Sequence, residues 1–292
     1  MKKSYKDYRA LALDILRGEW LIQDSPALRA AARSFLRKEN IDVTLTGDKP
    51  KSALVTIKGE SFEADPGNDG AAPARDSLIL VVPVHGTLTK YDNCTGCSVM
   101  EVVDTMEEYR GDESIVGVVL DIDSPGGVVN AIMPLVAEIR KWQNDGKPVI
   151  AHVDQCCSAA YWIASQTDAI FADNIMSQIG SIGAYAQIVD DRENKQTGEK
   201  TIDIYAEQST EKNREYRAAL DGDVKPMQDR LSKTVNIFIE AVKSGRPDIK
   251  ADAEGVMSGA VFMAPEAVDL GMVNGMADIQ ECVKIAYVRA NV

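Results

Sequence analysis

Cysteine and long apolar runs are scarce in this sequence. Its five cysteines among 292 residues are too few for a disulfide framework, and their odd number is typical of a reducing compartment. The apolar run at residues 78–84 is far shorter than the roughly 20 residues that a membrane-spanning helix needs. The basic residues 1–6 are not followed by the apolar segment of a signal peptide. We therefore expect a cytoplasmic protein without a membrane anchor.

Positive charge is also in the minority. Lys and Arg number 32 against 45 Asp and Glu, which gives a formal net charge of −13 and a pI near 4.7. An acidic protein gains little from releasing phosphate counterions, so we expect no nucleic-acid partner. With 45% hydrophobic and 26% charged residues, the chain has the composition of a soluble globular protein with a sizeable core.

The sequence contains no clear pattern for a metal or a cofactor. Cys94 and Cys97 have the C-x-x-C spacing of zinc ligands, but neither a second pair nor a well-placed histidine accompanies them. A glycine-rich phosphate loop and a metal-binding carboxylate motif are both missing. We therefore expect no metal and no cofactor.

The first 75 residues differ from the rest of the chain. Residues 5–38 carry apolar side chains at helical spacing, which predicts two helices separated near Ser25 and Pro26. Residues 60–75 contain repeated Pro and Gly and have the composition of a linker. We therefore predict a helical N-terminal extension and linker over residues 1–75 and a second domain over residues 76–292.

Strand-like and helical segments alternate in the second domain. Strands are predicted at residues 77–84, 115–122, 148–153, 169–172, 184–189 and 202–205. Helices are predicted at residues 98–109, 128–144, 224–244, 265–270 and 277–286 and directly after Ser158. Near-continuous β-branched runs that alternate with helices are typical of a mostly parallel sheet covered on both faces. The predicted fold class is therefore α/β.

Ser158 lies at a predicted strand-to-helix turn. A serine there can expose its hydroxyl as a nucleophile beside backbone N–H groups that stabilise an oxyanion. The same position suits a helix N-cap, for which serine is among the best residues, so position alone leaves both interpretations open. The preceding Cys156 and Cys157 are interpreted as small buried packing residues, with a cysteine nucleophile as the alternative.

A serine nucleophile needs a base, and the chain offers only two histidines. His85 and His152 each lie within or at the end of a predicted buried strand, where a histidine is usually structural. His152 also precedes Ser158 by only a few residues, which leaves no obvious facing geometry. A Ser-His-Asp triad therefore stays an alternative rather than the preferred interpretation.

Four motifs follow one another within residues 77–286. They are Ser124-Pro125-Gly126-Gly127, the segment S-A-A-Y-W-I-A-S that begins at Ser158, Gly180-Ser181-Ile182-Gly183, and the closing segment at residues 259–273. In this order and spacing they resemble the signal peptide peptidase A family of serine peptidases, and most of all its phage branch, the prohead (capsid maturation) proteases. The resemblance implies a Clp/crotonase-like fold, in agreement with the α/β prediction.

The resemblance also implies a Ser-Lys dyad, with the lysine downstream of residues 180–183. Lys212 is the preferred candidate, although the glycine that usually precedes the family's lysine is missing and Glu211 adjoins it. A lysine base needs a pKa lowered by burial or by a nearby positive charge, whereas Lys212 lies in a charged stretch. In some members of the family the lysine comes from a neighbouring subunit. We therefore expect a homo-oligomer with active sites near subunit interfaces.

The remaining site residues are backbone donors and a second serine. Gly126 and Gly127 follow a strand, and glycines let backbone N–H groups approach a tetrahedral intermediate, although Pro-Gly is also a common turn pair. By resemblance, the N–H groups of Gly127 and Ala159 would form the oxyanion hole. The hydroxyl of Ser181 would help to hold the lysine amine, with a plain turn serine as the alternative.

These residues together predict a serine endopeptidase that cleaves extended peptide segments and processes phage capsid or scaffold proteins. Three alternatives stay open on the same fold. They are a signal-peptide-degrading peptidase, a crotonase-type acyl-CoA enzyme and an inactive assembly component.

Overall fold

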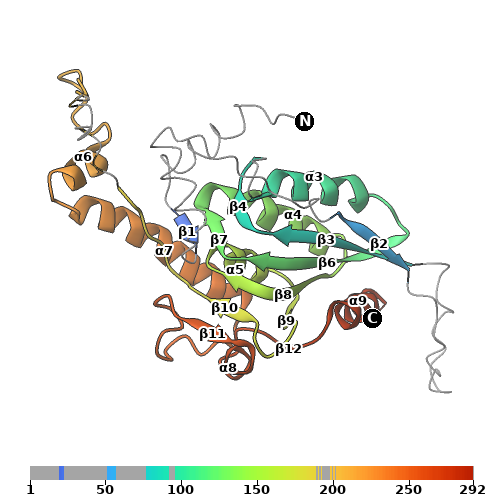
Figure 1. Cartoon of the computed structure of the whole chain (residues 1–292). Coiled ribbons are helices and arrows are strands. Elements are labelled where there is room, and N and C mark those ends of the chain that lie inside the picture. The colour runs from blue at the N-terminus through green and yellow to red at the C-terminus, as the bar shows by residue number, and fades with distance from the viewer. Residues whose placement is uncertain are drawn as a thin grey trace, which may run out of the picture.

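The computed structural model describes residues 20–22, 51–56, 77–91, 96–188, 190, 192, 198, 200 and 202–291. A large sheet and a small sheet lie at the centre of the described structure, with helices around them (Figure 1). Among the described helices, none is both long and apolar enough to cross a membrane.

The large sheet has eight strands and is mostly parallel. Its main path runs β11-β10-β8-β6-β3-β2, with β9 paired to β8 and β12 paired to β9. Only β2 and β11, at the two ends of this path, are antiparallel to their neighbours. The strands are β2 (Ala53–Thr56), β3 (Leu78–His85), β6 (Ile115–Ser124), β8 (Val149–Cys157), β9 (Ala169–Ala172), β10 (Gln178–Gly180), β11 (Val261–Met263) and β12 (Gly275–Met276). The predicted α/β fold class is confirmed.

The small sheet has four strands in the order β1-β7-β4-β5. They are β1 (Trp20–Ile22), β4 (Thr87–Thr89), β5 (Gly96–Ser98) and β7 (Gly126–Val128). Because β7 follows β6 after a single residue and β4 follows β3 in the same way, the two strands carry the chain from the large sheet into the small one. The small sheet therefore lies at the carboxyl ends of β3 and β6.

Helices cover both faces of the large sheet. The described helices are α3 (Val99–Arg110), α4 (Ile132–Asn144), α5 (Ala159–Ala164), α6 (Arg214–Leu220), α7 (Lys225–Gly245), α8 (Ala264–Asp269) and α9 (Ile279–Ala290), and a 3₁₀ turn, η1 (Val129–Ala131), precedes α4. Pro134 lies in the first turn of α4, where its missing N–H leaves no helical hydrogen bond unmade. The predicted helix therefore begins four residues later than residue 128.

Alternate residues of the central strands pack into two separate cores. Leu80 and Leu120 belong to the larger core, which α3, α4, α5 and α7 complete. Ile79, Val119 and Ile150 point to the other face and pack against α9. Full burial of each such side chain contributes about 1.5–3 kcal/mol. Burial on both faces explains why these strands have nearly continuous apolar sequences.

Two predicted strands are wrong. Residues 202–206 have no regular secondary structure, and among residues 184–188 only Tyr185 forms an isolated bridge. Ile202 and Ile204 are 78% and 91% exposed. The apolar face that would stabilise a strand at residues 202–205 is therefore not buried within this chain, although the residue types favour a strand.

The first 75 residues include two described strands, both paired with strands of the second predicted domain. Strand β1 pairs with β7 and β2 pairs with β3, each in antiparallel register. Strand β1 lies where the first predicted helix would end. The rest of both predicted helices and the linker at residues 60–75 lie outside the described residues. The domain boundary near residue 75 stays a prediction.

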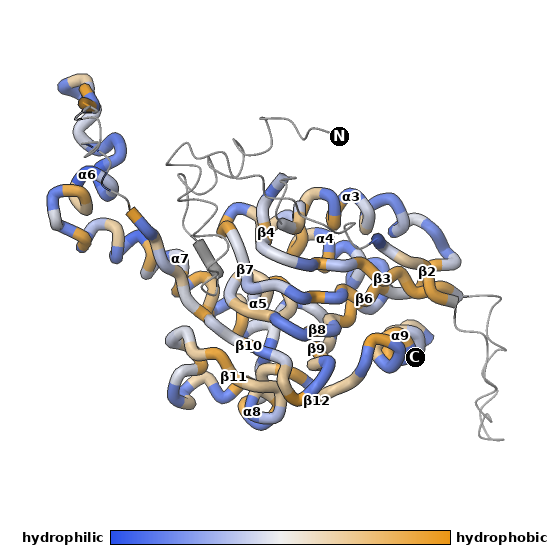
Figure 2. The backbone as a smooth tube through the Cα atoms, in the orientation of Figure 1, coloured by the Kyte–Doolittle hydropathy of each residue, from blue (hydrophilic) through white to orange (hydrophobic). Residues whose placement is uncertain are grey.

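One segment projects from the body of the molecule. We call the described residues from 198 to 224 the arm, which includes α6 and connects to α7 (Figure 1). Hydrophobic and hydrophilic residues alternate along the arm, whereas the large-sheet strands β3 and β6 contain long hydrophobic stretches (Figure 2). Most described residues of the arm are exposed and none is buried, so burial within one copy stabilises the arm little.

Candidate active site

Ser158 lies between the end of β8 and the start of α5 and is 1% exposed. Its backbone has φ 55° and ψ −118°, a conformation that costs a residue with a side chain about 1–3 kcal/mol. The Ser158 N–H donates to the carbonyl of Gly180 at 2.7 Å, which helps to hold this conformation. All six residues of α5 are buried, so the turn is anchored on both sides.

The hydroxyl of Ser158 does not cap α5. It instead donates to the backbone carbonyl of Gly183 at 3.4 Å. The N-cap interpretation, which the sequence left open, is therefore wrong. A strained serine at a strand-to-helix turn, with a hydroxyl that makes one long hydrogen bond, is the arrangement expected of a nucleophile.

The predicted segment at residues 180–183 lies against Ser158. Two of its carbonyls, those of Gly180 and Gly183, accept from the Ser158 N–H and hydroxyl. Gly180 has φ 123°, and a Cβ there would lie 2.6 Å from the carbonyl oxygen of Ala260. Ser181 follows with φ 55° and donates its N–H to that carbonyl at 2.7 Å. Close approach of the Ala260 carbonyl thus explains the glycine at position 180. Positive φ angles strain the backbone at both Ser158 and Ser181.

The glycine pair lies in β7, which contacts α5. Gly126 has φ 105°, and its N–H donates to the Ser124 hydroxyl at 3.1 Å. A Cβ on Gly127 would lie 2.0 Å from the carbonyl oxygen of Leu88 in β4. The small sheet therefore requires glycine at position 127 for packing, a reason that the sequence did not reveal. Ala159, the other predicted donor, is the first residue of α5.

Lys212 lies on the arm and is exposed. Its N–H donates to the carbonyl of Ser209 at 3.2 Å, and its side chain lines a shallow pocket with Asp203 and Tyr205. Figure 1 places α6, which directly follows this turn, well away from α5. One copy of the chain brings together the serine, the glycine pair and residues 180–183, but not Lys212.

The two histidines form a network of ion pairs with carboxylates. His152 contacts Asp121 through Nδ1 at 2.8 Å and Asp173 through Nε2 at 3.1 Å. His85 contacts the other oxygen of Asp121 through Nε2 at 2.9 Å. Both ring nitrogens of His152 are thus occupied by carboxylates, which leaves none to accept the proton of Ser158. The geometry does not assemble a Ser-His-Asp triad in this chain.

Asp121 sets the ionisation of this network. Its hydrogen bond raises the pKa of His85 against the opposing effect of burial. Burial lowers the pKa of His152, but Asp121 and Asp173 outweigh it and raise the pKa above its usual value. Burial likewise opposes ionisation of Asp121, yet the two histidines hold its pKa well below the usual range. At mildly acidic pH, Asp121 is therefore negatively charged and both histidines are positively charged.

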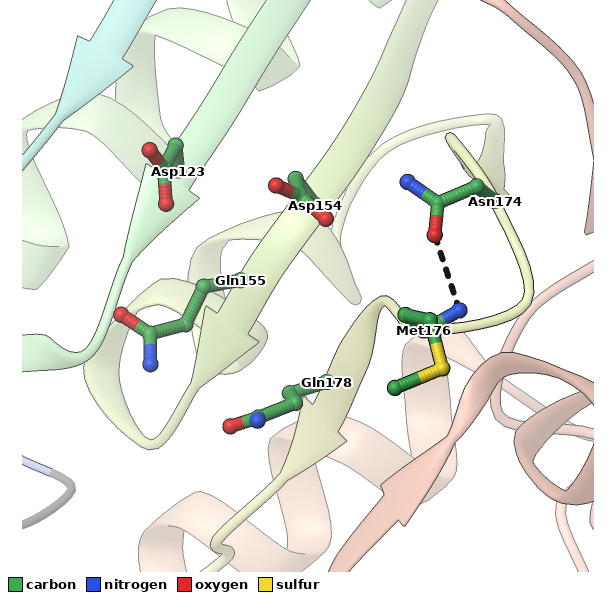
Figure 3. Close-up of a pocket in the computed structure, with 6 residues that line it drawn as sticks. All are labelled: Asp123, Asp154, Gln155, Asn174, Met176 and Gln178. Atoms are coloured by element: carbon green, nitrogen blue, oxygen red, sulfur yellow. Dashed lines mark hydrogen bonds between the residues drawn. The ribbon is translucent and has the colours of Figure 1, made fainter.

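A polar pocket lies beside this network at the carboxyl ends of β6 and β8 (Figure 3). Its lining residues are Asp123, Asp154, Gln155, Asn174, Met176 and Gln178. Burial raises the pKa of Asp123. These residues are not among those predicted from the sequence, although Asp123 and Asp154 each directly follow a predicted strand, which was a usable signal. Among the described residues, no group of three or more His, Cys, Asp or Glu side chains is arranged so that it could hold a metal ion.

Cys156 and Cys157 are both fully buried. Burial raises the pKa of Cys157 to about 12 and that of Cys156 well above its usual value. The thiols are therefore protonated near neutral pH, whereas a cysteine nucleophile must be a thiolate. Their burial matches the packing role predicted for them.

Comparison with known proteins extends the sequence resemblance. Residues 141–292 match the model of peptidase family S49. The chain is 27% identical over 217 residues to Protease 4 of Haemophilus influenzae, covering 71% of this chain and 34% of that protein. It is 26% identical over 239 residues to Capsid assembly protease C of Escherichia phage lambda, covering 75% of this chain and 52% of that protein. The chain thus spans about a third to a half of the length of these relatives.

A solved structure of the 1510-N membrane-bound stomatin-specific protease is also similar. Its sequence is 21% identical, the TM-score is 0.42, and the match covers 70% of this chain and 82% of that one.

Proposed function

Because the chain belongs to peptidase family S49, a family of serine peptidases also called the signal peptide peptidase A family, we propose that it hydrolyses peptide bonds with Ser158 as nucleophile. The observation that carries the proposal is the Ser158 turn. Ser158 has a strained backbone conformation directly before α5, a helix that contacts β7, and its hydroxyl does not cap that helix. Local strain of this kind persists where the surrounding structure enforces it, most often at functional sites.

We assign the base to Lys212. Its amine would take the proton of the Ser158 hydroxyl as Oγ attacks the carbonyl carbon of the substrate. The N–H groups of Gly127 and Ala159 would donate to the resulting oxyanion, and each such donor contributes about 2.7–4 kcal/mol to stabilising the transition state. The protonated amine then passes its proton to the leaving amine. The same amine activates the water that hydrolyses the Ser158 ester.

We further propose that Lys212 acts on the serine of a neighbouring copy. On its own copy it is exposed on the arm and is not brought to Ser158. Ile202 and Ile204 of the same arm are 78% and 91% exposed. Docking of the arm on a second copy would cover these isoleucines and desolvate the lysine in one step. The hydroxyl of Ser181 would then hold the amine beside Ser158.

As substrates we propose extended segments of phage capsid or scaffold proteins. The similarity to Capsid assembly protease C over 75% of this chain supports this choice. The similarity to Protease 4 supports degradation of signal peptides as a second candidate function. Incubation with capsid and scaffold proteins encoded beside the gene, followed by mass mapping of the fragments, separates the two candidates.

The nucleophile itself is tested by labelling the full chain with a fluorescent fluorophosphonate. We expect one adduct at Ser158, located by mass mapping, and no adduct at this position in Ser158→Ala. Ser114→Ala is the matched control, because the hydroxyl of this half-buried serine donates to Asp112 and the substitution leaves its backbone hydrogen bonds in place. Turnover of a CoA thioester that survives Ser158→Ala, without any adduct in the parent, would instead indicate the crotonase-type alternative.

A further inference from the structure

Strand β1 occupies one edge of the glycine strand β7. The two strands are antiparallel, with Trp20 opposite Val128, Leu21 opposite Gly127 and Ile22 opposite Gly126. The other edge of β7 pairs with β4. Both edges of the strand that contains the proposed oxyanion donor Gly127 are therefore occupied within a single chain (Figure 1).

The edge covered by β1 is the one that an incoming peptide could use. The small sheet runs β1-β7-β4-β5, so removal of β1 would leave β7 as an edge strand with unpaired backbone N–H and C=O groups. Extended peptides bind such edges by adding a strand. Because β7 contacts α5, whose first residue follows Ser158, a peptide on this edge would pass close to the serine.

We propose that β1 is an internal substrate-like strand, which holds the place of a substrate's extended segment on β7 and must leave before another segment can pair there. This inference rests on the proposed peptidase function and adds the class of segment that the edge accepts. The occupant is a three-residue strand in antiparallel register with residues 126–128, so the edge accepts an extended segment that pairs antiparallel to β7. Apolar and β-branched residues also favour the extended conformation.

Because β1 is only three residues long, another extended peptide can displace it from β7. Three residues form only a few backbone hydrogen bonds with β7. Each such bond contributes modestly, because water replaces it when the strand leaves. While β1 pairs with β7, another peptide can bind only those molecules in which β1 has left the edge. The apparent affinity for that peptide is therefore lowered in proportion to the fraction of such open molecules. We expect removal of β1 from the edge to raise that affinity about 5- to 30-fold.

Proline scanning of β1 tests the proposal in the full chain. Along an antiparallel strand, neighbouring residues point their N–H groups alternately toward the partner and away from it. Of Leu21→Pro and Ile22→Pro, at least one therefore removes a hydrogen bond to β7, and the other serves as an internal comparison. Leu21→Val keeps the strand and is the conservative control. All variants are made in a Ser158→Ala background, so that binding is measured without cleavage.

The probe is a fluorescent synthetic peptide with the sequence of residues 16–26, and its binding is followed by anisotropy. We expect one proline variant to bind it about 5- to 30-fold more tightly than the parent, and Leu21→Val to bind it as the parent does. Hydrogen exchange at residues 126–128 should be faster in that proline variant and slow again when the peptide is added. In the Ser158→Ala chain without a proline substitution, saturating peptide should speed exchange at residues 20–22.

The proposal is overturned if both proline variants bind the peptide as the parent does and exchange at residues 126–128 is unchanged. If a proline variant fails to fold, the Ser158→Ala chain without a proline provides the test, because unchanged exchange at residues 20–22 on adding peptide would contradict release of β1. Failure of the proposed function has a different signature. Peptide binding would then respond to the proline substitutions, but Ser158 in the chain without any substitution would not react with the fluorophosphonate.

Discussion

The turn at Ser158 and the arm that bears Lys212 differ in almost every physical respect. Ser158 is 1% exposed, and its strained backbone is held by a hydrogen bond to Gly180 and by the buried helix α5. Lys212 is exposed on a projecting segment, where surface ion pairs such as Arg214–Glu211 contribute little. One chain therefore sets the geometry of the nucleophile but leaves the environment of the proposed base undetermined.

Because of this difference, we expect substitutions in the two regions to affect stability and activity differently. Substitutions near Ser158 disturb a packed core and should lower both the free energy of unfolding and the rate of hydrolysis. Substitutions on the arm touch few packed side chains and should lower the rate alone. The following predictions test this separation, in order of decreasing effect.

Lys212→Ala should abolish most activity without destabilising the fold. Loss of a general base typically costs about 10²–10⁴-fold in rate. We expect a fall of roughly 10³-fold in fluorophosphonate labelling of Ser158, with a Tm unchanged within error, because the side chain is exposed. Lys200→Ala, on the same charged stretch, is the matched control and should label like the parent. Equal labelling of Lys212→Ala and the parent would remove Lys212 from the mechanism.

Mixing variants shows whether the two regions meet within one copy or between copies. If a neighbouring copy supplies Lys212, Ser158→Ala and Lys212→Ala chains that are inactive alone should regain part of the activity after they are refolded together. The serine of one variant would then meet the lysine of the other. An inactive mixture that still forms oligomers would show that both groups act in the same copy.

Gly127→Ala should destabilise the region around the Ser158 turn. The added Cβ would lie 2.0 Å from the Leu88 carbonyl oxygen, which is backbone and cannot move alone. Such overpacking costs about 3 kcal/mol, measured by urea unfolding, and displacement of β7 should also slow labelling of Ser158. Gly111→Ala is the control, since a Cβ there meets nothing within 4 Å and its φ is −77°. A stable, fully active Gly127→Ala would contradict the packing role of this glycine.

Asp121→Asn should give a smaller, pH-dependent loss of stability. Asp121 accepts from His85 and His152, and hydrogen bonds between charged groups contribute about 1.5–3 kcal/mol. Each histidine has a raised pKa, so its contribution is fully present below pH 6.5 and is lost as the pH rises through the folded-state value. The lowered pKa of Asp121 makes its contribution present above pH 3.8 and lost on further acidification.

The destabilisation by Asp121→Asn should therefore be larger at about pH 5.5 than at about pH 8.5, as measured by urea unfolding. Asp123→Asn is the matched control on the same strand. Burial raises the pKa of Asp123, so its ionisation opposes folding as the pH rises, and the amide should be neutral or slightly stabilising at the higher pH. A pH-independent effect of Asp121→Asn would show that the network contributes by packing alone.

Sequence patterns correctly predicted those elements whose structure depends on local interactions or on burial of a strand on both faces. The apolar runs that became β3, β6 and β8 were recognisable because a parallel sheet covered on both faces has no polar face. The strand at residues 202–205 was predicted from the same residue types and is wrong, because burial within one chain does not reach it. Residue type thus predicted a strand only where tertiary contacts completed it.

The sequence by itself determined the α/β alternation, the serine at a strand-to-helix turn and the glycines that close backbone approach requires. These depend on side-chain periodicity and on φ angles, which act over a few residues. Only the tertiary structure decided that the Ser158 hydroxyl faces Gly183 rather than capping α5, that Gly127 lies against Leu88, and that Trp20–Ile22 pairs with β7. Those contacts join segments far apart in the chain, and the free energy that selects them comes from packing and strand pairing that no local pattern encodes.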